Sequence, residues 1–323
     1  MKKTFWEWVR PIAIYSLLAA LLYFALRNVP LTEIWATLRG LKFWQILTLL
    51  GLNVLIYILI TLRWWLIVCA EKKGVSFFPL LAIRVAVFGV SYFTLGPQVG
   101  GEPLQVLYLQ RNYGMTYTRA TSTVVMDKLL EFLANFFLLG FGLTAVIQAG
   151  IFSASKNSSL ASLSGLAILL LLPPIHIVLL YHGKYPVSAV LRKFSNNKIV
   201  RFVAASERMA GTFCRRHLRS LVSAIFVSVL AALSMVIEFF CITWFLGIHL
   251  SFWQTIAAWT AGWLAFLVPV PGGLGALEAS QVFAFGVFGI SAVSAIGVTL
   301  LIRARDLLIG GLGLLIASRG IKK

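Results

Sequence analysis

Two glycine-rich breaks interrupt otherwise apolar segments of this chain, at 96–103 and at 269–278. Each break places a glycine pair and a glutamate after a proline, and a short apolar run follows it. A helix that starts at such a break offers unpaired backbone N–H groups and a partial positive charge, which can hold a phosphate group. Pro103 suits the first position of its helix, because the N–H that proline lacks would be unpaired there. The predicted substrate-binding residues at the breaks are Gly100, Gly101, Glu102, Gly272, Gly273 and Glu278, of which the glutamates would balance charge or couple to protons.

A structural role would explain the same residues. Glycines allow close packing of helices, and glutamates can cap helix ends. We favour binding because the pattern occurs twice, and because irregular backbone within a bilayer occurs where protein or a water-filled cavity satisfies it.

Charged side chains inside apolar segments form the second set of candidates, because their cost in a membrane makes them face a cavity or one another. Asp127 and Glu131 are spaced i, i+4 and share a helix face with Lys128 beside them. An anionic head group needs cationic partners, so we expect Lys128, Arg303 and Arg305 to bind it. For Asp127, a binding role and a structural role stay equally open, and an Asp127–Arg303 ion pair would tie the two halves of the chain together.

Four other side chains receive weaker or structural assignments. Arg84 is expected near the cytoplasmic end of its span, with its charge reaching the interface. Glu238 has no evident partner in the sequence, and Arg305 is expected to point away from the face shared by Arg303 and Asp306. Trp64 lies near a span end, where tryptophan usually anchors a helix at the membrane interface.

The composition dictates the elements that must hold these residues. Of 323 residues, 60% are hydrophobic and 12% are charged, with a mean hydropathy of +0.92. These values exclude a soluble globular domain, intrinsic disorder and a disulfide scaffold. The sequence predicts an all-α polytopic membrane bundle of about eight spans in a single integral membrane domain. Apolar segments occur at 11–27, 43–70, 79–95, 119–149, 158–181, 220–246, 253–270 and 291–318, with shorter runs at 102–110 and 274–289.

Motifs for other chemistry are missing from the sequence. The three cysteines lie far apart, and the four histidines form no metal-binding pattern. No nucleotide-binding fingerprint occurs either. We therefore expect no metal, no cofactor and no catalytic residue. The net charge of +18 is attributed to loops at an anionic membrane surface, not to nucleic acid binding.

An internal repeat is suggested by the spacing of these features. Glu102 and Glu278 are 176 residues apart, and the same shift superimposes several other features. The predicted repeats are 1–157 and 158–323, each with a re-entrant hairpin at its break. Amphipathic helices are expected at 31–42 and 198–219, the second lying in the interface or packed on the bundle.

Charge decides the relative orientation of the repeats. The segment 182–219 carries nine Lys/Arg and one acid, so the positive-inside rule places it in the cytoplasm. The repeats are then inverted, both termini are cytoplasmic, and Lys156 is external. Inverted repeats with broken helices are typical of secondary transporters.

At these motifs the chain resembles the integral membrane domain of lysylphosphatidylglycerol synthases, a flippase-like family. The resemblance extends over about 10–318. It is carried by the first break, Ala120, the Asp127-Lys128-x-x-Glu131 element, the Pro-Gly-Gly-Leu-Gly-x-x-Glu element at 271–278, and Arg303. The family commonly has Asp-Arg where this chain has Asp127-Lys128. The resemblance implies lipid translocation, and the aminoacyltransferase domain of the two-domain members is absent from this sequence.

The favoured hypothesis is therefore a plasma-membrane lipid translocase. Its expected cargo is an anionic phospholipid or a polyprenyl-phosphate lipid. The alternatives are a membrane-embedded transferase acting on a lipid head group, and a membrane anchor that binds a soluble partner enzyme through 182–219.

Overall fold

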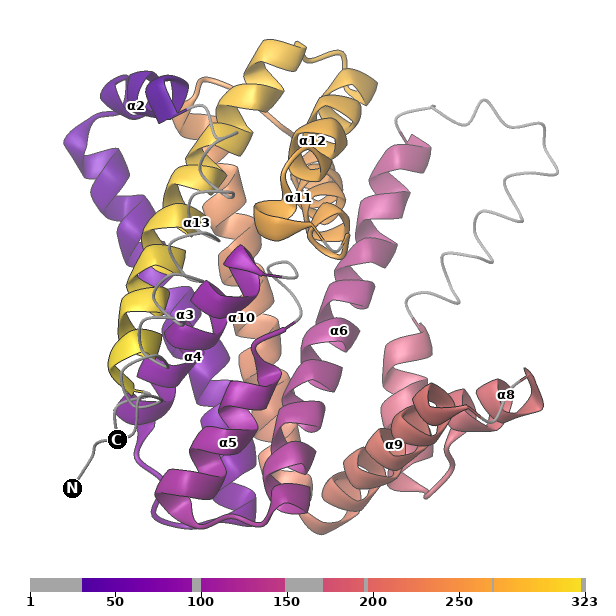
Figure 1. The fold of residues 1–323 in the computed structure, drawn as a ribbon. Helices are drawn as coiled ribbons and strands as arrows, with labels where there is room; N and C mark the ends of the chain where they lie inside the picture. The colour runs from indigo at the N-terminus through magenta and orange to yellow at the C-terminus, as the bar shows by residue number, and fades with distance from the viewer. Residues whose placement is uncertain (1–30, 95–99, 149–170, 195–196, 269, 321–323) are drawn as a thin grey trace, which may run out of the picture.

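The computed structural model describes residues 31–94, 100–148, 171–194, 197–268 and 270–320. Within these ranges all regular structure is helical, which confirms the predicted all-α class (Figure 1). Several predictions fall outside the described residues: the first span at 11–27, the Gly96-Pro97 step of the first break, Lys156 and the repeat boundary at 157/158.

The helices follow the apolar segments closely. In the first half they are α2 (Leu31–Arg39), α3 (Phe43–Glu71), α4 (Phe77–Phe93), α5 (Glu102–Tyr113) and α6 (Tyr117–Gln148). The described part of the second half begins with a helical stretch, Leu171–Tyr181. There the helices are α8 (Pro186–Phe194), α9 (Lys198–Arg216), α10 (Leu218–Phe245), α11 (Phe252–Phe266), the 3₁₀ turn η1 (Pro271–Gly273), α12 (Ala276–Val287) and α13 (Ala292–Gly320).

Four helices of the second half have counterparts in the first. α10, α11, α12 and α13 start 174 or 175 residues after α3, α4, α5 and α6, respectively. Counterparts run in opposite directions in Figure 1: α3 leads away from the α2 end of the bundle, whereas α10 leads back toward it.

Two short helix pairs contain the breaks. α4 has 17 residues and α11 has 15, so each is about 22–26 Å long and shorter than the hydrocarbon core. Each is followed by a 12-residue helix, α5 or α12, that returns to the side from which it came. The α4–α5 pair opens at the α9 end of the bundle, and the α11–α12 pair opens at the α2 end (Figure 1).

The helices pack in three main pairs. α3 packs along α10, α4 packs along α13, and α6 packs along α11. The last two pairs each join a break-containing hairpin of one half to the long helix of the other half. Buried residues of α10, α11, α12 and α13, among them Phe285 and Val298, form the largest apolar cluster.

The α4–α13 crossing brings backbone against backbone. A Cβ atom on Gly89 would lie 2.6 Å from the carbonyl oxygen of Gly310 and 2.8 Å from the nitrogen of Leu314. A Cβ atom on Gly313 would collide with the carbonyl oxygen of Val85. Small residues permit this approach, as they do at many helix crossings in membranes.

Gly313→Ala is expected to lower the free energy of unfolding by about 1–3 kcal/mol, because the new methyl group overpacks the crossing. The matched control is Gly311→Ala, since no atom lies within 4 Å of a Cβ built on Gly311. Thermal unfolding in detergent should show a lower midpoint for Gly313→Ala alone. Equal midpoints for the two variants would contradict the close approach.

Exposed apolar side chains cover the outside of the bundle. Of the described helices, α3 and α10 are long and apolar enough to cross a bilayer, with 29 and 28 residues. Large apolar residues on their exposed faces include Phe43, Leu47, Val54, Val222, Phe226 and Ile237. Contiguous exposed apolar surface of this kind is expected to face lipid tails.

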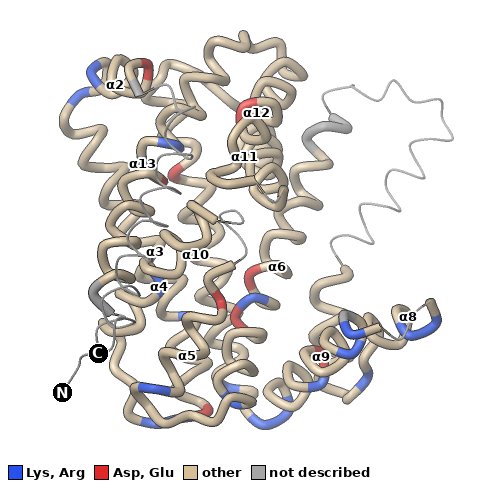
Figure 2. The backbone as a smooth tube through the Cα atoms, viewed as in Figure 1, with Lys and Arg blue, Asp and Glu red and all other residues tan. Residues whose placement is uncertain are grey.

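Basic residues gather at the opposite end from α2. Figure 2 shows Lys and Arg along α8, along α9 and at the turn between α5 and α6. The apolar stripe of α9 packs on the bundle, because Ala210 and Phe213 are buried against Met126 and Leu130 of α6. Phe202, on the same helix, is exposed. Of the two expectations for 198–219, packing on the bundle therefore describes most of α9.

Candidate functional site

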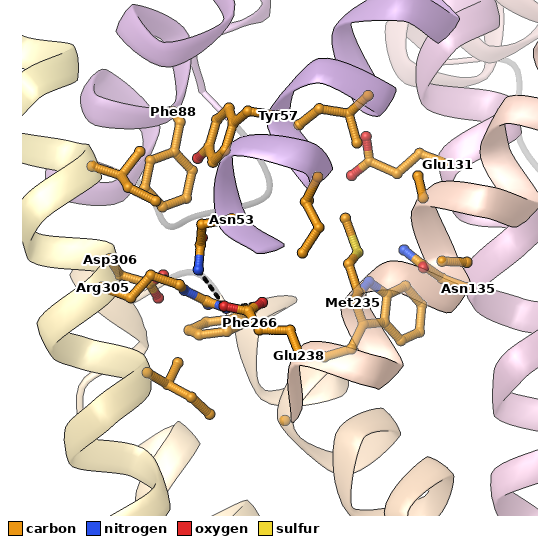
Figure 3. Close-up of a pocket in the computed structure, with 18 of the residues that line it drawn as sticks. Asn53, Tyr57, Phe88, Glu131, Asn135, Met235, Glu238, Phe266, Arg305 and Asp306 are labelled. Atoms are coloured by element: carbon orange, nitrogen blue, oxygen red, sulfur yellow. Dashed lines mark hydrogen bonds and ion pairs between the residues drawn. The ribbon is translucent and has the colours of Figure 1, made fainter. Parts of the chain in front are cut away.

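A cavity of about 220 Å³ lies inside the bundle and is lined by residues of both halves. Figure 3 shows polar side chains from α3, α6, α10 and α13 around it. Its charged lining residues are Arg63, Arg84, Glu102, Lys128, Glu131, Glu238, Arg305 and Asp306. Its amide and aromatic residues are Asn53, Asn135, Gln281, Tyr57, Phe88, Phe239, Trp259, Trp263 and Phe266.

Asp127 lies behind the cavity wall, between two arginines from different helices. The Nε atom of Arg63 in α3 is 2.6 Å from one carboxylate oxygen, and an Nη atom of Arg84 in α4 is 2.6 Å from the other. Arg84 also donates to the carbonyl oxygen of Ile60. Only 1% of the Asp127 side chain is exposed. This cluster joins α3, α4 and α6, and its charges stabilise one another because little water reaches them.

Lys128 lies at the cavity surface between two glutamates. Its Nζ atom is 3.5 Å from Glu102 at the start of α5 and 3.4 Å from Glu131 on α6. The three side chains are 20–24% exposed, far more than Asp127. Glu131 also accepts a hydrogen bond from Arg63 at 3.2 Å. The cluster therefore extends from the buried Asp127 to a solvent-accessible lysine.

A second charged cluster lies on the α10–α13 side of the cavity. Arg305 contacts Glu238 at 2.8 Å and Asp306 at 2.8 Å. Asn53 of α3 donates to Glu238, which joins the two halves (Figure 3). The Arg305 side chain is 26% exposed, so it is the accessible member of this cluster.

Glu278 and Arg303 pair with one another and do not line the cavity. An Nη atom of Arg303 is 2.7 Å from Glu278. The same guanidinium donates to the carbonyl oxygens of Gly272 at 3.1 Å and Gly273 at 3.4 Å. Arg303 therefore satisfies the irregular backbone of the second break from inside the protein.

The breaks themselves are closely packed and capped by their glutamates. Glu102 accepts a hydrogen bond from the N–H of Gly100 at 2.8 Å, and Glu278 accepts one from Gly275 at 2.9 Å. A Cβ atom on Gly101 would lie 2.6 Å from the Val87 carbonyl oxygen. Close packing by glycine and capping by glutamate are the contacts expected if the breaks have a structural role.

The second break also touches the first hairpin and bends sharply. Gly272 has a φ of +61° and lies against the ring of Tyr92 of α4. Gly273 has the same φ and lies against the ring of Phe266. Both residues need the left-handed backbone conformation that glycine adopts without strain.

Several sequence-based assignments need correction. Arg84 does not reach the interface; it is buried and bound to Asp127. The considered Asp127–Arg303 pair is wrong, because each residue has other partners. Trp64 is not an interfacial anchor, since its side chain is fully buried.

Two further assignments failed on the second cluster. Glu238 has partners in Arg305 and Asn53. Arg305, expected to point away from Asp306, forms an ion pair with it. The first error came from considering one helix at a time, because Glu238 and Arg305 belong to different helices. The second came from helical spacing alone, because the long Arg305 side chain reaches its neighbour Asp306 on the same helix.

Arg63 is the main site residue that sequence reasoning missed. It lies eight residues before the end of α3. A charge at that depth in a long apolar helix was the available signal. The buried amide of Gln281 and the buried indole of Trp263 in the cavity lining were missed as well.

Three buried polar atoms on cavity-lining residues have no hydrogen-bond partner among the described residues. They are Nε of Arg84, Nε1 of Trp263 and Oε1 of Gln281. Burying such groups is costly unless a partner satisfies them.

The charges on the cavity wall balance. The lining holds four cations and four carboxylates, and Asp127 lies behind it. An entering anion must therefore displace a carboxylate from Lys128 or Arg305, or enter together with a cation or a proton.

Comparison with known proteins adds one match. The family described as the lysylphosphatidylglycerol synthase TM region matches residues 9–313. No curated protein matches the chain, and no solved structure matches it either.

Proposed function

Since the chain belongs to the lysylphosphatidylglycerol synthase TM region family, we propose that it moves a phosphate-bearing lipid between membrane leaflets. Membership makes it a membrane protein related to lipid handling. The proposed cargo is an anionic phospholipid or a polyprenyl-phosphate lipid, carried without chemical change.

The observation that supports transport most directly is that the central cavity is lined by a partly exposed cation from each charged cluster. Lys128 belongs to the first half and Arg305 to the second, and both line the cavity. In this proposal the phosphate contacts Lys128 or Arg305 while the lipid tails stay in the bilayer. Charge-assisted hydrogen bonds of this kind are among the strongest in proteins.

The remaining predicted site residues have supporting roles in this proposal. Asp127 holds the arginines of the first cluster, and Glu102 and Glu131 exchange Lys128 with the phosphate. The residues that shape the two breaks are Gly100, Gly101, Gly272, Gly273, Glu278 and Arg303. They hold the half-helix N-termini beside the cavity.

We propose further that 1–157 and 158–323 are inverted repeats. The matching helix starts and opposite helix directions support this division. The gathering of basic residues at the α9 end supports a cytoplasmic location for that end, and hence for both termini, in the plasma membrane.

Reconstitution into liposomes tests the function. Liposomes carry a trace of NBD-labelled phosphatidylglycerol in both leaflets, and dithionite quenches only the label that reaches the outer leaflet. We expect the protected fraction to disappear faster with protein than in protein-free liposomes. Mass spectrometry of the same samples should show unchanged lipid masses.

A new lipid mass that depends on the protein would favour the transferase alternative. Exchange no faster than in protein-free liposomes, with labelled phosphatidylglycerol and with a labelled polyprenyl phosphate, would reject the translocase.

A further inference from the structure

A second cleft, of about 270 Å³, lies at the basic end of the bundle and shares no lining residue with the central cavity. It forms where α9 crosses the start of α6 and the end of α3. Three arginines line it, one from α6 and two from α9, together with a single carboxylate. The polar lining residues are Arg119, Arg208, Arg216, Glu71, Ser122, Thr118 and Thr212.

Helix geometry places the two α9 arginines on one face, where Nε of Arg208 also donates to the carbonyl oxygen of Ala204 at 3.2 Å. Arg208, Thr212 and Arg216 are spaced i, i+4 and i+8, so they lie on one face of α9. Arg208 and Arg216 are two turns apart, or about 12 Å along the axis. Arg119 supplies the third guanidinium from the facing helix, and all three arginines are exposed.

The cleft carries a surplus of positive charge. Its only carboxylate, Glu71, lies 4.0 Å from Arg119 and 3.4 Å from the imidazole of His217. Three guanidinium groups face one carboxylate, which leaves a formal charge of +2. The central cavity differs in this respect, because its lining cations and carboxylates are equal in number. Convergent like charges repel unless a counter-ion occupies the space between them.

The start of α6 adds hydrogen-bond donors to the same cleft. The first helical bond of α6 runs from Ala120 to the carbonyl oxygen of Thr116. The N–H groups of Thr118 and Arg119 therefore precede the intrahelical pattern and have no acceptor within the helix. The helix dipole favours an anion at this end. Thr212 already donates its hydroxyl hydrogen to the backbone carbonyl oxygen of Arg208, so it can offer only lone pairs.

We propose that this cleft binds a dianionic phosphate group, a phosphomonoester or a diphosphate, through Arg119, Arg208 and Arg216. A charge of −2 on the ligand matches the surplus of the cleft. A lipid head group at the membrane surface and a free phosphate compound share this chemistry. The site is separate from the central cavity, and its existence does not depend on transport.

Pyrophosphate binding to the full chain provides the test. The protein is placed in nanodiscs of zwitterionic phosphatidylcholine and titrated with sodium pyrophosphate in a calorimeter. We expect saturable binding that weakens as NaCl is raised, because salt screens exposed charges. The double variant Arg208→Gln/Arg216→Gln should lose at least about tenfold in affinity.

The matched control removes two charges from the same region outside the cleft. Arg192→Gln/Arg201→Gln has the same net charge as the test variant, and neither residue lines the cleft. Its affinity should stay within about twofold of wild type if the site is local, since single exposed charges contribute little. If both double variants lost the same affinity for pyrophosphate, the binding would be diffuse attraction to the basic end, and the proposed site would be wrong. Lack of saturable binding by wild type would overturn it as well.

A lipid arm identifies the source of the phosphate. Nanodiscs that contain phosphatidic acid present a phosphomonoester at the membrane surface. If the site accepts lipid, phosphatidic acid should weaken pyrophosphate binding to wild type, and the double variant should retain less of this lipid on purification. Unchanged pyrophosphate affinity would assign the same site to free phosphate compounds.

Discussion

Asp127→Asn is expected to lower the free energy of unfolding by about 3–5 kcal/mol, the range measured when one partner of a buried ion pair is removed. The amide has the shape of the carboxylate but carries no charge. The two buried arginines therefore lose one negative counter-charge. Arg63 keeps its 3.2 Å ion pair with Glu131, whereas Arg84 keeps no ion pair and retains the Ile60 carbonyl oxygen and the face of the Trp64 ring. Size-exclusion chromatography in detergent and the thermal unfolding midpoint measure the loss.

Glu102→Gln is the matched control for this prediction. Glu102 is 24% exposed and bound to Lys128, and pairs exposed to this degree contribute about 1 kcal/mol or less. A triple variant, Asp127→Leu with Arg63→Met and Arg84→Met, should recover most of the stability, because no buried charge stays unpaired. Wild-type stability in Asp127→Asn would contradict the structural role of the cluster.

Lys128→Gln is expected to slow lipid exchange by about 10- to 100-fold while the protein stays folded. A hydrogen bond to a charged group contributes about 1.5–3 kcal/mol, and each 1.4 kcal/mol is a factor of ten. Glutamine leaves Glu102 and Glu131 without their shared lysine, but both are partly exposed and can be hydrated. Initial dithionite-quenching rates, at equal protein per liposome, measure the effect.

Arg111→Gln provides the comparison for Lys128→Gln. Arg111 is exposed in the last turn of α5, outside the cavity, and carries the same charge. Its exchange rate should match wild type within about twofold. If Lys128→Gln exchanged lipid as fast as Arg111→Gln, the proposed contact between Lys128 and the phosphate would be wrong.

Helix positions could be predicted from the sequence because they depend on local chemistry. Apolar run length and the glycine–proline breaks predicted 43–70 for α3 and 220–246 for α10, and each helix end differs by at most two residues. Gly114, just after α5, and Gly275, just before α12, have positive φ angles, which explains why α5 ends and α12 begins sharply at these glycines. Burial and turn preferences act over a few residues, so one sequence suffices to locate them.

Ion-pair partners could not be predicted, because they depend on how helices cross. Asp127 meets Arg63 and Arg84 only after α3, α4 and α6 pack together. The repeat spacing also misled, since it suggested that Asp127 and Arg303 occupy equivalent positions and could attract one another. The backbone recurs between the halves but these charges do not: Asp127 pairs within the first half and Arg303 within the second.

The exchanged packing of the hairpins has a mechanical consequence. α4 packs on α13 and α11 packs on α6, so neither half of the sequence forms a separate rigid body. Each unit that can tilt combines a hairpin from one half with a long helix from the other. One unit contains α4, α5 and α13, the other contains α11, α12 and α6, and the α3–α10 pair lies between them. At the α4–α13 crossing, Gly89 and Gly313 bring backbone against backbone, so we expect these two helices to tilt together as one unit. Its tilt would shift both faces of the bundle in opposite senses, which couples opening on one side to closure on the other.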